Sequence, residues 1–307
     1  MLVKRKRTST TSFGNRGRIS HDSSGYYNSR LYTAKEPSFQ AANGENRVPP
    51  EVADRIYCKS SERMDEIPDD SIHLMVTSPP YNASKAYDDD LPLQEHLNLL
   101  RTVFEEVYRK LVHGGRACVN VANLGRKPYI PMHSYIIDIM EEIGFLMRGE
   151  IIWDKSASSG PSTAWGSWKS ATNPVLRDVH EYILVFSKGT FARKPGEKKN
   201  TISKEAFLEW TRSIWTFPAV MAKSIGHPAP FPRELPHRLI QLYTFQGDMV
   251  LDPFCGSGST CLAALDDGRH YIGYEIDPEY VDLAHERIRR CRDALSDSPS
   301  DSTIQSD

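Results

Sequence analysis

The sequence predicts an α/β fold in which strands and helices alternate to form a mostly parallel, doubly wound sheet. Two stretches carry this prediction. The run Ile72-His73-Leu74-Met75-Val76 lacks polar alternation, which is typical of a strand buried on both faces. Between Leu93 and Leu111 apolar residues recur at helical spacing, which predicts a helix, and Gly114-Gly115 is expected to end it.

The other predicted elements continue this alternation. In the first half, strands are expected at residues 56–58, 117–121, 148–153 and 181–186, with a helix at 134–143 that ends at Gly144. In the second half, helices at 233–244, 259–266 and 278–292 alternate with strands at 249–251 and 271–274. Consecutive elements of this kind usually lie side by side in one sheet.

Composition and cysteine usage exclude several classes of protein. The 307 residues are 39% hydrophobic and 25% charged, enough for one large domain with insertions or for two modest domains. No apolar run approaches the length of a membrane span, about 20 residues, and the basic start has no apolar segment typical of a signal peptide. The five cysteines include no C-x-x-C pair, so we expect no disulfide framework, no metal site and a reducing cytoplasm.

Both ends of the chain differ in composition from the middle. Residues 1–48 hold nine Lys and Arg against three acidic residues and show no apolar period, which predicts a disordered basic arm. Such an arm either is only a solvated tail or contacts nucleic acid. The last fifteen residues hold four Asp and no basic residue, which predicts a disordered acidic tail.

Residues 155–225 interrupt the alternation of strands and helices. They contain eleven Lys and Arg against five acidic residues, and four of the five tryptophans. A basic segment with clustered indoles is typical of an insertion adapted to a partner, although each tryptophan could instead pack the core of a small subdomain.

A glycine-rich loop follows the predicted strand 249–251. It reads Asp252-Pro253-Phe254-Cys255-Gly256-Ser257-Gly258 and leads into a helix. Glycines let a backbone approach a ligand closely, and a helix N-terminus favours negative charge. The strand 271–274 ends in Glu275-Ile276, where an acid is placed to bind the hydroxyls of a ribose. The sequence therefore predicts a nucleoside-containing cofactor, although the loop is neither a P-loop nor a complete dinucleotide fingerprint.

The stretch "TSPPYN" (77–82) follows the strand 72–76 directly. Two consecutive prolines remove two backbone N–H donors and fix φ at both positions, so the segment cannot continue a sheet ladder. It can hold carbonyl oxygens and an aromatic face in a stiff arrangement at the end of the strand.

These motifs together resemble the S-adenosylmethionine-dependent DNA methyltransferases that modify exocyclic amino groups. The resemblance lies in "TSPPYN", "DPFCGSGST" (252–260) and "YEID" (274–277), and spans about residues 55–290. The catalytic motif comes before the cofactor loop, which resembles the circularly permuted beta-type arrangement of that family. The resemblance implies the seven-stranded class I methyltransferase sheet, with both loops at the carboxyl ends of neighbouring strands.

The resemblance also implies roles for individual residues. Ser78 Oγ and the Pro79 carbonyl would accept hydrogens of the target amine, Pro80 would stiffen the loop and Tyr81 would stack on a flipped base. Methyl transfer would then be direct, by positioning and electrostatics, without a covalent intermediate. Ser at the first position goes mostly with N4 of cytosine in that family and Asp mostly with N6 of adenine, so Ser78 favours cytosine.

Further residues are implied for the cofactor and for DNA. The cofactor set comprises Asp252, Pro253, Phe254, Cys255, Gly256, Ser257, Gly258, Glu275, Ile276, Ser60 and Pro232. The DNA set comprises Trp165, Trp168, Lys169, Arg177, Arg193 and Lys194. The segment Cys58–Ser61 lacks the acid that often contacts the adenine of the cofactor, and Cys255 is interpreted as a small apolar filler. The strand opening His180-Glu181 is interpreted as structural.

The complete prediction is a site-specific, S-adenosylmethionine-dependent DNA methyltransferase that modifies cytosine N4 in duplex DNA. It would be either the partner of a restriction endonuclease that acts on the same site or a solitary enzyme. Three alternatives stay open: an N6-adenine enzyme, an RNA or protein amino-methyltransferase, and a non-catalytic DNA-binding protein. The predicted regions are a basic arm (1–50), a catalytic half (51–154), a target-recognition region with strand 181–186 (155–225), a cofactor-binding half (226–293) and an acidic tail (294–307).

Overall fold

The computed structural model describes residues 8–9, 21–22, 44–80, 91–125, 127–156, 168–219 and 231–296. The chain divides into two compact units, Met1–Gln40 and Ala41–Asp307. In the first unit, β1 (Thr8–Ser9) and β2 (His21–Asp22) form a short parallel pair. Every other described element belongs to the second unit.

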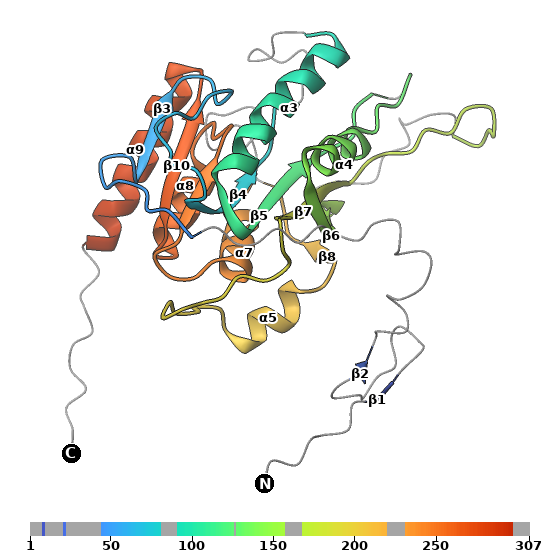
Figure 1. Ribbon diagram of the computed structural model, residues 1–307. Coiled ribbons are helices and arrows are strands. Elements are labelled where there is room, and N and C mark those ends of the chain that lie inside the picture. Colours follow the sequence, from blue (N-terminus) through green and yellow to red (C-terminus); the bar gives the residue numbers. More distant parts are fainter. Residues whose placement is uncertain are drawn as a thin grey trace. The chain divides into compact units, whose positions relative to one another are not determined.

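The second unit is built on one sheet, as the sequence predicts, but the sheet has eight strands among the described residues rather than seven. The strand order is β3-β10-β9-β4-β5-β7-β6-β8. Their bounds are β3 (Arg55–Cys58), β4 (Ile72–Thr77), β5 (Leu111–Val121), β6 (Phe145–Asp154), β7 (His180–Lys188), β8 (Ile214–Thr216), β9 (Met249–Asp252) and β10 (His270–Glu275). All neighbouring pairs are parallel except the two that β7 makes with β5 and β6 (Figure 1).

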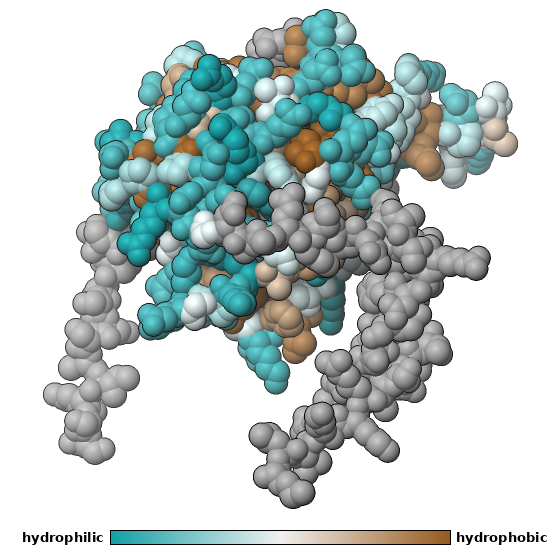
Figure 2. All heavy atoms as spheres, viewed as in Figure 1, coloured by the Kyte–Doolittle hydropathy of each residue, from teal (hydrophilic) through white to brown (hydrophobic). Residues whose placement is uncertain are grey.

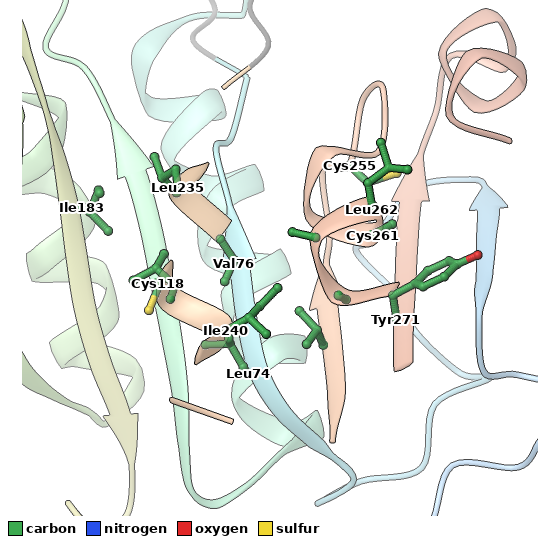
Figure 3. Packing of buried hydrophobic residues seen from close by; sticks show 14 of the residues in the cluster. Leu74, Val76, Cys118, Ile183, Leu235, Ile240, Cys255, Cys261, Leu262 and Tyr271 are labelled. Carbon is green, nitrogen blue, oxygen red and sulfur yellow. The ribbon is translucent and has the colours of Figure 1, made fainter. Parts of the chain in front are cut away.

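Helices cover both faces of this sheet, which explains the apolar strand sequences. The helices are α3 (Leu93–Lys110), α4 (Met132–Ile143), α5 (Lys204–Trp210), α7 (Glu234–Tyr243), α8 (Ser259–Asp266) and α9 (Pro278–Ser296). One core packs the sheet against α3 and α4, and the other packs it against α7, α8 and α9. In the second core, Val76, Cys118 and Ile183 of three strands lie on the side of the sheet that faces Leu235 and Ile240 of α7 (Figure 3).

The predicted end of α3 was wrong. The helix stops at Lys110, and β5 begins at the next residue and runs through Gly114. Lys110 is buried and donates to the carbonyl of Ile67 at 2.6 Å, so a tertiary contact fixes the end of the helix. Gly114 has φ +80°, and a Cβ there would lie 2.7 Å from the carbonyl oxygen of Ala192, so this glycine permits a close backbone approach. By contrast, α4 ends where predicted, with Gly144 in the left-handed conformation.

The region 155–225 contributes more to the sheet than predicted. It supplies β7 as expected, and also α5 and β8, which pairs with β6. Trp215 of β8 is only 1% exposed and joins the core, whereas Trp168 is 70% exposed. The tryptophans of this region therefore do not share one role.

The amino-terminal edge of the sheet holds a buried ion cluster around Asp248, which precedes β9. Its carboxylate accepts hydrogen bonds from Arg193, from Lys198 Nζ at 2.9 Å and from the Phe245 amide at 2.8 Å. Burial alone would raise the pKa of Asp248, but the hydrogen bond and charge of Arg193, with the charge of His73, bring the pKa below its usual value. The cations and the amide around Asp248 therefore offset the cost of burying its negative charge.

The face shown in Figure 2 is mostly hydrophilic, and one of its several groups of hydrophobic residues lies where Figure 1 draws α5. Phe207 and Leu208 of that helix and Ile214 of β8 are exposed by 51%, 58% and 64%. Among the helices of the described residues, none has the length and apolar character needed to cross a membrane.

Candidate active site

The two predicted functional loops meet at the carboxyl-terminal edge of the sheet. β9 lies between β10 and β4, so the loop after β9 and the stretch after β4 are neighbours. Thr77, the last residue of β4, donates its hydroxyl to Asp252 Oδ1 at 2.6 Å, and both side chains are buried. A single hydrogen bond thus joins two motifs that are 175 residues apart.

Asp252 has an unusual environment for a buried acid. Besides Thr77, it accepts the Phe254 amide at 3.2 Å, and these donors are neutral. Burial raises the pKa of Asp252 to about 6, because removal from water disfavours the charged form. A buried carboxyl group whose pKa is shifted in this way is typical of a functional site.

The glycine-rich loop is held in place from three sides. The Cys255 amide donates to the Tyr274 carbonyl at 2.8 Å, which ties the loop to β10. Arg287 of α9 donates to the carbonyl of Ser257 and, at 2.8 Å, to its hydroxyl. Gly258 starts α8 with φ +78°, and a Cβ at this position would lie 3.0 Å from Cβ of Ala284. The left-handed conformation and the tight packing both favour glycine here.

Glu275 organises the same loop. Its carboxylate accepts the amides of Gly256 at 2.8 Å, Ile276 at 2.9 Å and Asp277 at 3.0 Å. Burial raises the pKa of Glu275 above its ordinary value. An ionised carboxylate has about four acceptor sites, so Glu275 keeps capacity for a hydroxyl while it fixes the turn after β10.

Cys255 packs beside Cys261 beneath the loop, as the filler interpretation predicts. A Cβ on Gly273 would lie 2.9 Å from Cys255 Sγ and 3.2 Å from Cys261 Sγ. The neighbouring Cys261 thiol and burial raise the pKa of Cys255 well above its ordinary range. A neutral, enclosed thiol is not a nucleophile.

The remaining cofactor candidates lie at the margin of this edge. Ser60, after β3, is exposed and bonds Glu62 Oε2 at 2.9 Å. Ile276 is 61% exposed and its carbonyl contacts the thiol of Cys58. Pro232 is buried where α7 begins, and its carbonyl accepts the Leu235 amide at 3.1 Å. The preceding His227-Pro228 lies outside the described residues.

The proline motif stands where β4 ends. Ser78 is half-buried, Pro79 is buried and Pro80 is half-buried. Tyr81 lies outside the described residues. Asn120 of β5 brings its Nδ2 to 3.5 Å from Ser78 Oγ, so the end of β5 contributes directly to the surroundings of this serine.

Asn120 and Glu181 form a polar group that sequence reasoning missed. Asn120 is 2% exposed and donates through Nδ2 to Glu181 Oε2 at 2.6 Å. Glu181 is also bonded by Lys155, whose Nζ lies 5.3 Å from the centre of the Trp153 ring. The sequence interpretation of Glu181 as part of a structural strand opening did not include this connection to Ser78. The signal available in the sequence was Asn120, a polar residue near the end of the apolar strand β5.

The candidate DNA residues do not gather in one place. Trp168 and Lys169 are exposed in one segment, and Arg177 is half-buried. The structure places Arg193 at the opposite, amino-terminal edge, where its side chain is 8% exposed and paired with Asp248. We therefore withdraw Arg193 from the DNA set, whereas the exposed Lys194 stays a prediction. Trp165 lies outside the described residues.

Comparisons with known proteins agree with this arrangement. A family model described as DNA methylase (N6_N4_Mtase) matches residues 72–286. The type II methyltransferase M.MjaI of Methanocaldococcus jannaschii is 36% identical over 278 residues, which cover 76% of this chain and 90% of the relative. M.MthZI of Methanothermobacter thermautotrophicus is 33% identical over 270 residues, 76% of each chain.

Solved structures show the same fold. TTHA0409 of Thermus thermophilus, described as a candidate DNA modification methylase and solved with S-adenosyl-L-methionine, has a TM-score of 0.63 and 33% identity. The match covers 77% of this chain and 93% of that chain. PvuII DNA methyltransferase, described as cytosine-N4-specific, has a TM-score of 0.59 over 80% of this chain and 93% of its own. At 21% identity the latter supports the fold alone.

Proposed function

Because this chain belongs to the DNA methylase family, we propose that it transfers a methyl group from S-adenosylmethionine to the exocyclic N4 of a cytosine in duplex DNA. The observation that supports the proposal is the hydrogen bond between Thr77, the residue before Ser78, and Asp252, the first residue of the glycine-rich loop. Binding of the cofactor and chemistry on the amine can therefore share one edge of the sheet.

The residues of this edge suit the cofactor chemically. The buried carboxyl group of Asp252 lacks a cationic partner among the donors given above, and S-adenosylmethionine carries positive charge. Glu275 retains acceptor capacity for ribose hydroxyls, and the loop 252–258 brings backbone close to the ligand. When bound, S-adenosylmethionine supplies an electrophilic methyl group. Ser60, Ile276 and Pro232 are proposed as outer contacts.

The residues after β4 would prepare the nucleophile. The lone pair of an exocyclic amine is delocalised into the ring, so the amine is a poor nucleophile. Ser78 Oγ and the Pro79 carbonyl accept its hydrogens, which makes the nitrogen more tetrahedral and directs its lone pair. A nitrogen–carbon bond forms, the carbon–sulfur bond breaks with its electrons remaining on sulfur, and the nitrogen releases one proton to water.

Base choice rests on Ser78 and on its resemblance to enzymes that act on cytosine. Serine and aspartate can both accept a hydrogen from an amine, so N6 of adenine is the second candidate. The target base must leave the duplex to reach Ser78, at a cost of a few kcal/mol. Tyr81, Trp168 and Lys169 are proposed to contact the base or the DNA. A cognate restriction endonuclease is the proposed functional partner.

Incubation of the protein with methyl-labelled S-adenosylmethionine and unmodified duplex DNA, followed by nucleoside analysis, tests the proposal. We expect labelled N4-methylcytosine. Labelled N6-methyladenine would overturn the choice of base and keep the reaction. Absence of label in DNA under conditions in which the cofactor binds would overturn the proposed substrate.

A further inference from the structure

Asn120 carries a buried acceptor atom that has no hydrogen-bond partner within the described part of the chain. This atom is Oδ1, and the side chain as a whole is 2% exposed. A buried acceptor is costly to leave unpaired, so an unpaired acceptor beside the proposed reaction centre indicates a ligand group that completes it.

The orientation of the Asn120 amide follows from its neighbours. Glu181 Oε2 lies 2.6 Å from Nδ2, and a carboxylate can only accept hydrogen bonds, so the amide nitrogen must face Glu181. A flipped amide would bring two acceptors together. Lys155 bonds the other oxygen of Glu181 and fixes the carboxylate in turn. The side chains of Lys155 and Glu181 are 24% and 12% exposed, so solvent screens this pair little.

We propose that Asn120 is a catalytic residue that accepts a hydrogen of the target amine through Oδ1, and that Glu181 and Lys155 are positioning residues that hold the amide in this orientation. This inference rests on the proposed function. Asn120 Nδ2 donates to Ser78 Oγ at 3.5 Å, which places this amide group next to the serine, and the inference assigns the unpaired Oδ1 of the same amide to the amine that Ser78 receives.

The amine has two hydrogens, and three acceptors receive them. The Pro79 carbonyl accepts one, while Ser78 Oγ and Asn120 Oδ1 share the other in a three-centre bond. As the nitrogen bonds to the methyl carbon it becomes positively charged, and the shared hydrogen becomes the proton that passes to water. A preorganised dipole directed at this developing charge stabilises the transition state more than the bound substrate.

Single-turnover methyl transfer to duplex DNA, with binding of S-adenosylmethionine measured separately, tests the role of Asn120. For Asn120→Ala we expect the rate to fall about 100-fold, the loss typical of one preorganised group, while the cofactor dissociation constant stays within about twofold. A rate within about threefold of wild type would overturn the proposal.

Exchanging the amide of residue 120 with the carboxylate of residue 181 tests which atom of the Asn120 amide faces Glu181. This test does not depend on truncating a side chain. In Asn120→Asp, two carboxylates at hydrogen-bond distance repel each other when both are ionised, so we expect a slow enzyme at pH 8 whose rate recovers toward pH 6, where the pair takes up and shares a proton. In Asn120→Asp/Glu181→Gln the amide at 181 donates to the carboxylate at 120, and we expect recovery to within about tenfold of wild type at pH 8. A double variant no faster than Asn120→Asp would contradict the inference.

The other end of β7 provides a matched control. Lys188 pairs with Asp70 at 2.6 Å, with side chains 13% and 20% exposed, far along the strand from Ser78. We expect Lys155→Met to slow transfer about tenfold and Lys188→Met to leave the rate within about twofold. Equal losses in both variants would show a general structural effect and overturn the positioning role.

The outcomes separate this inference from the proposed function. An inactive wild-type protein would remove both. An active wild-type protein whose rate is insensitive to residue 120 would remove only the inference. N6-methyladenine as product would remove only the choice of base, because the exocyclic amine and its hydrogens are common to adenine and cytosine.

Discussion

A buried aspartate lies at each end of strand β9, one just before its first residue and one at its last, and the two carboxyl groups have opposite surroundings. Asp248, at the amino-terminal edge, is bonded by Arg193 and Lys198, and its pKa lies below the ordinary value. Asp252, at the carboxyl-terminal edge, has hydroxyl and amide donors, and burial raises its pKa to about 6. The fold neutralises the charge of Asp248 with neighbouring cations, whereas the carboxyl group of Asp252 has no such partner among its described donors and is available to a charged ligand.

The same contrast holds on neighbouring strands. β7 ends at Lys188, which pairs with Asp70, and its second residue, Glu181, connects through Asn120 to Ser78. β4 begins after Ser71, which donates to the Pro68 carbonyl at 2.6 Å, and ends before Ser78. Asp70 and Ser71 at the amino edge are bonded within the protein, whereas the polar groups named at the carboxyl edge are proposed to serve the reaction. In an open α/β sheet ligands bind at this second edge.

The largest expected effect is on stability at the amino edge. Asp248→Asn leaves the buried Arg193 with only the more distant and partly exposed Glu45, 3.7 Å away, as a charge partner, so we expect the free energy of unfolding to fall by about 3–5 kcal/mol. Methyl transfer per folded molecule should not change. Urea unfolding and single-turnover assays on the same preparations measure both quantities.

Glu45→Gln is the control for that variant. Glu45 pairs with Arg193 and Lys198, as Asp248 does, but its side chain is 40% exposed. Loss of its charge should therefore lower the free energy of unfolding by less than about 1 kcal/mol. Slower methyl transfer in Asp248→Asn without a loss of stability would contradict the assignment of stability to the amino edge and of the reaction to the carboxyl edge.

The second expected effect is a pH dependence at the carboxyl edge. The pKa of Asp252 is about 6 in the folded protein against 3.8 as the reference value, so the folded state holds the proton more tightly. Its contribution is complete below about pH 4 and is lost as pH rises through 6. We expect the stability of wild type relative to Asp252→Asn to fall on the order of 3 kcal/mol between pH 4 and pH 7, from urea unfolding. A difference that stays flat or rises with pH would contradict the burial of an uncompensated acid.

The smallest expected effect separates two glycines with the same backbone conformation. Gly247 and Gly258 both have φ +78°, but a Cβ at Gly247 meets nothing within 4 Å, whereas at Gly258 it meets Ala284. Alanine at either position should cost about 1–2 kcal/mol of stability. Only Gly258→Ala should weaken binding of S-adenosylmethionine, by about tenfold in calorimetric titration, because it distorts the start of α8. Equal affinity in the two variants would exclude a role for this loop in cofactor binding.

The predicted elements agree with the structure where the sequence itself carries the signal. The apolar run of β4 and the helical stripe of α3 depend on local periodicity, and α8 has the predicted bounds. Elements that depend on tertiary partners were missed. β8 has three residues and exists through its pairing with β6, and α5 has seven.

The site was predictable to the extent that it lies in continuous motifs. Residues 77–80 and 252–258 are adjacent in sequence to the strands that position them. Asn120 and Glu181 are single residues on strands 61 positions apart, and only the antiparallel insertion of β7 beside β5 brings them together. The DNA contact predicted for Arg193 was wrong because composition identifies only a basic segment. The partner that holds this side chain, Asp248, lies 55 positions away in the sequence.

The two serines that flank β4 give the most direct test of the central claim, that the carboxyl edge performs methyl transfer and the amino edge stabilises the fold. Single-turnover transfer to duplex DNA should fall about 100-fold or more in Ser78→Ala. In Ser71→Ala it should stay within about twofold, with a loss of about 1 kcal/mol in stability. Wild-type transfer rates in Ser78→Ala would contradict the account.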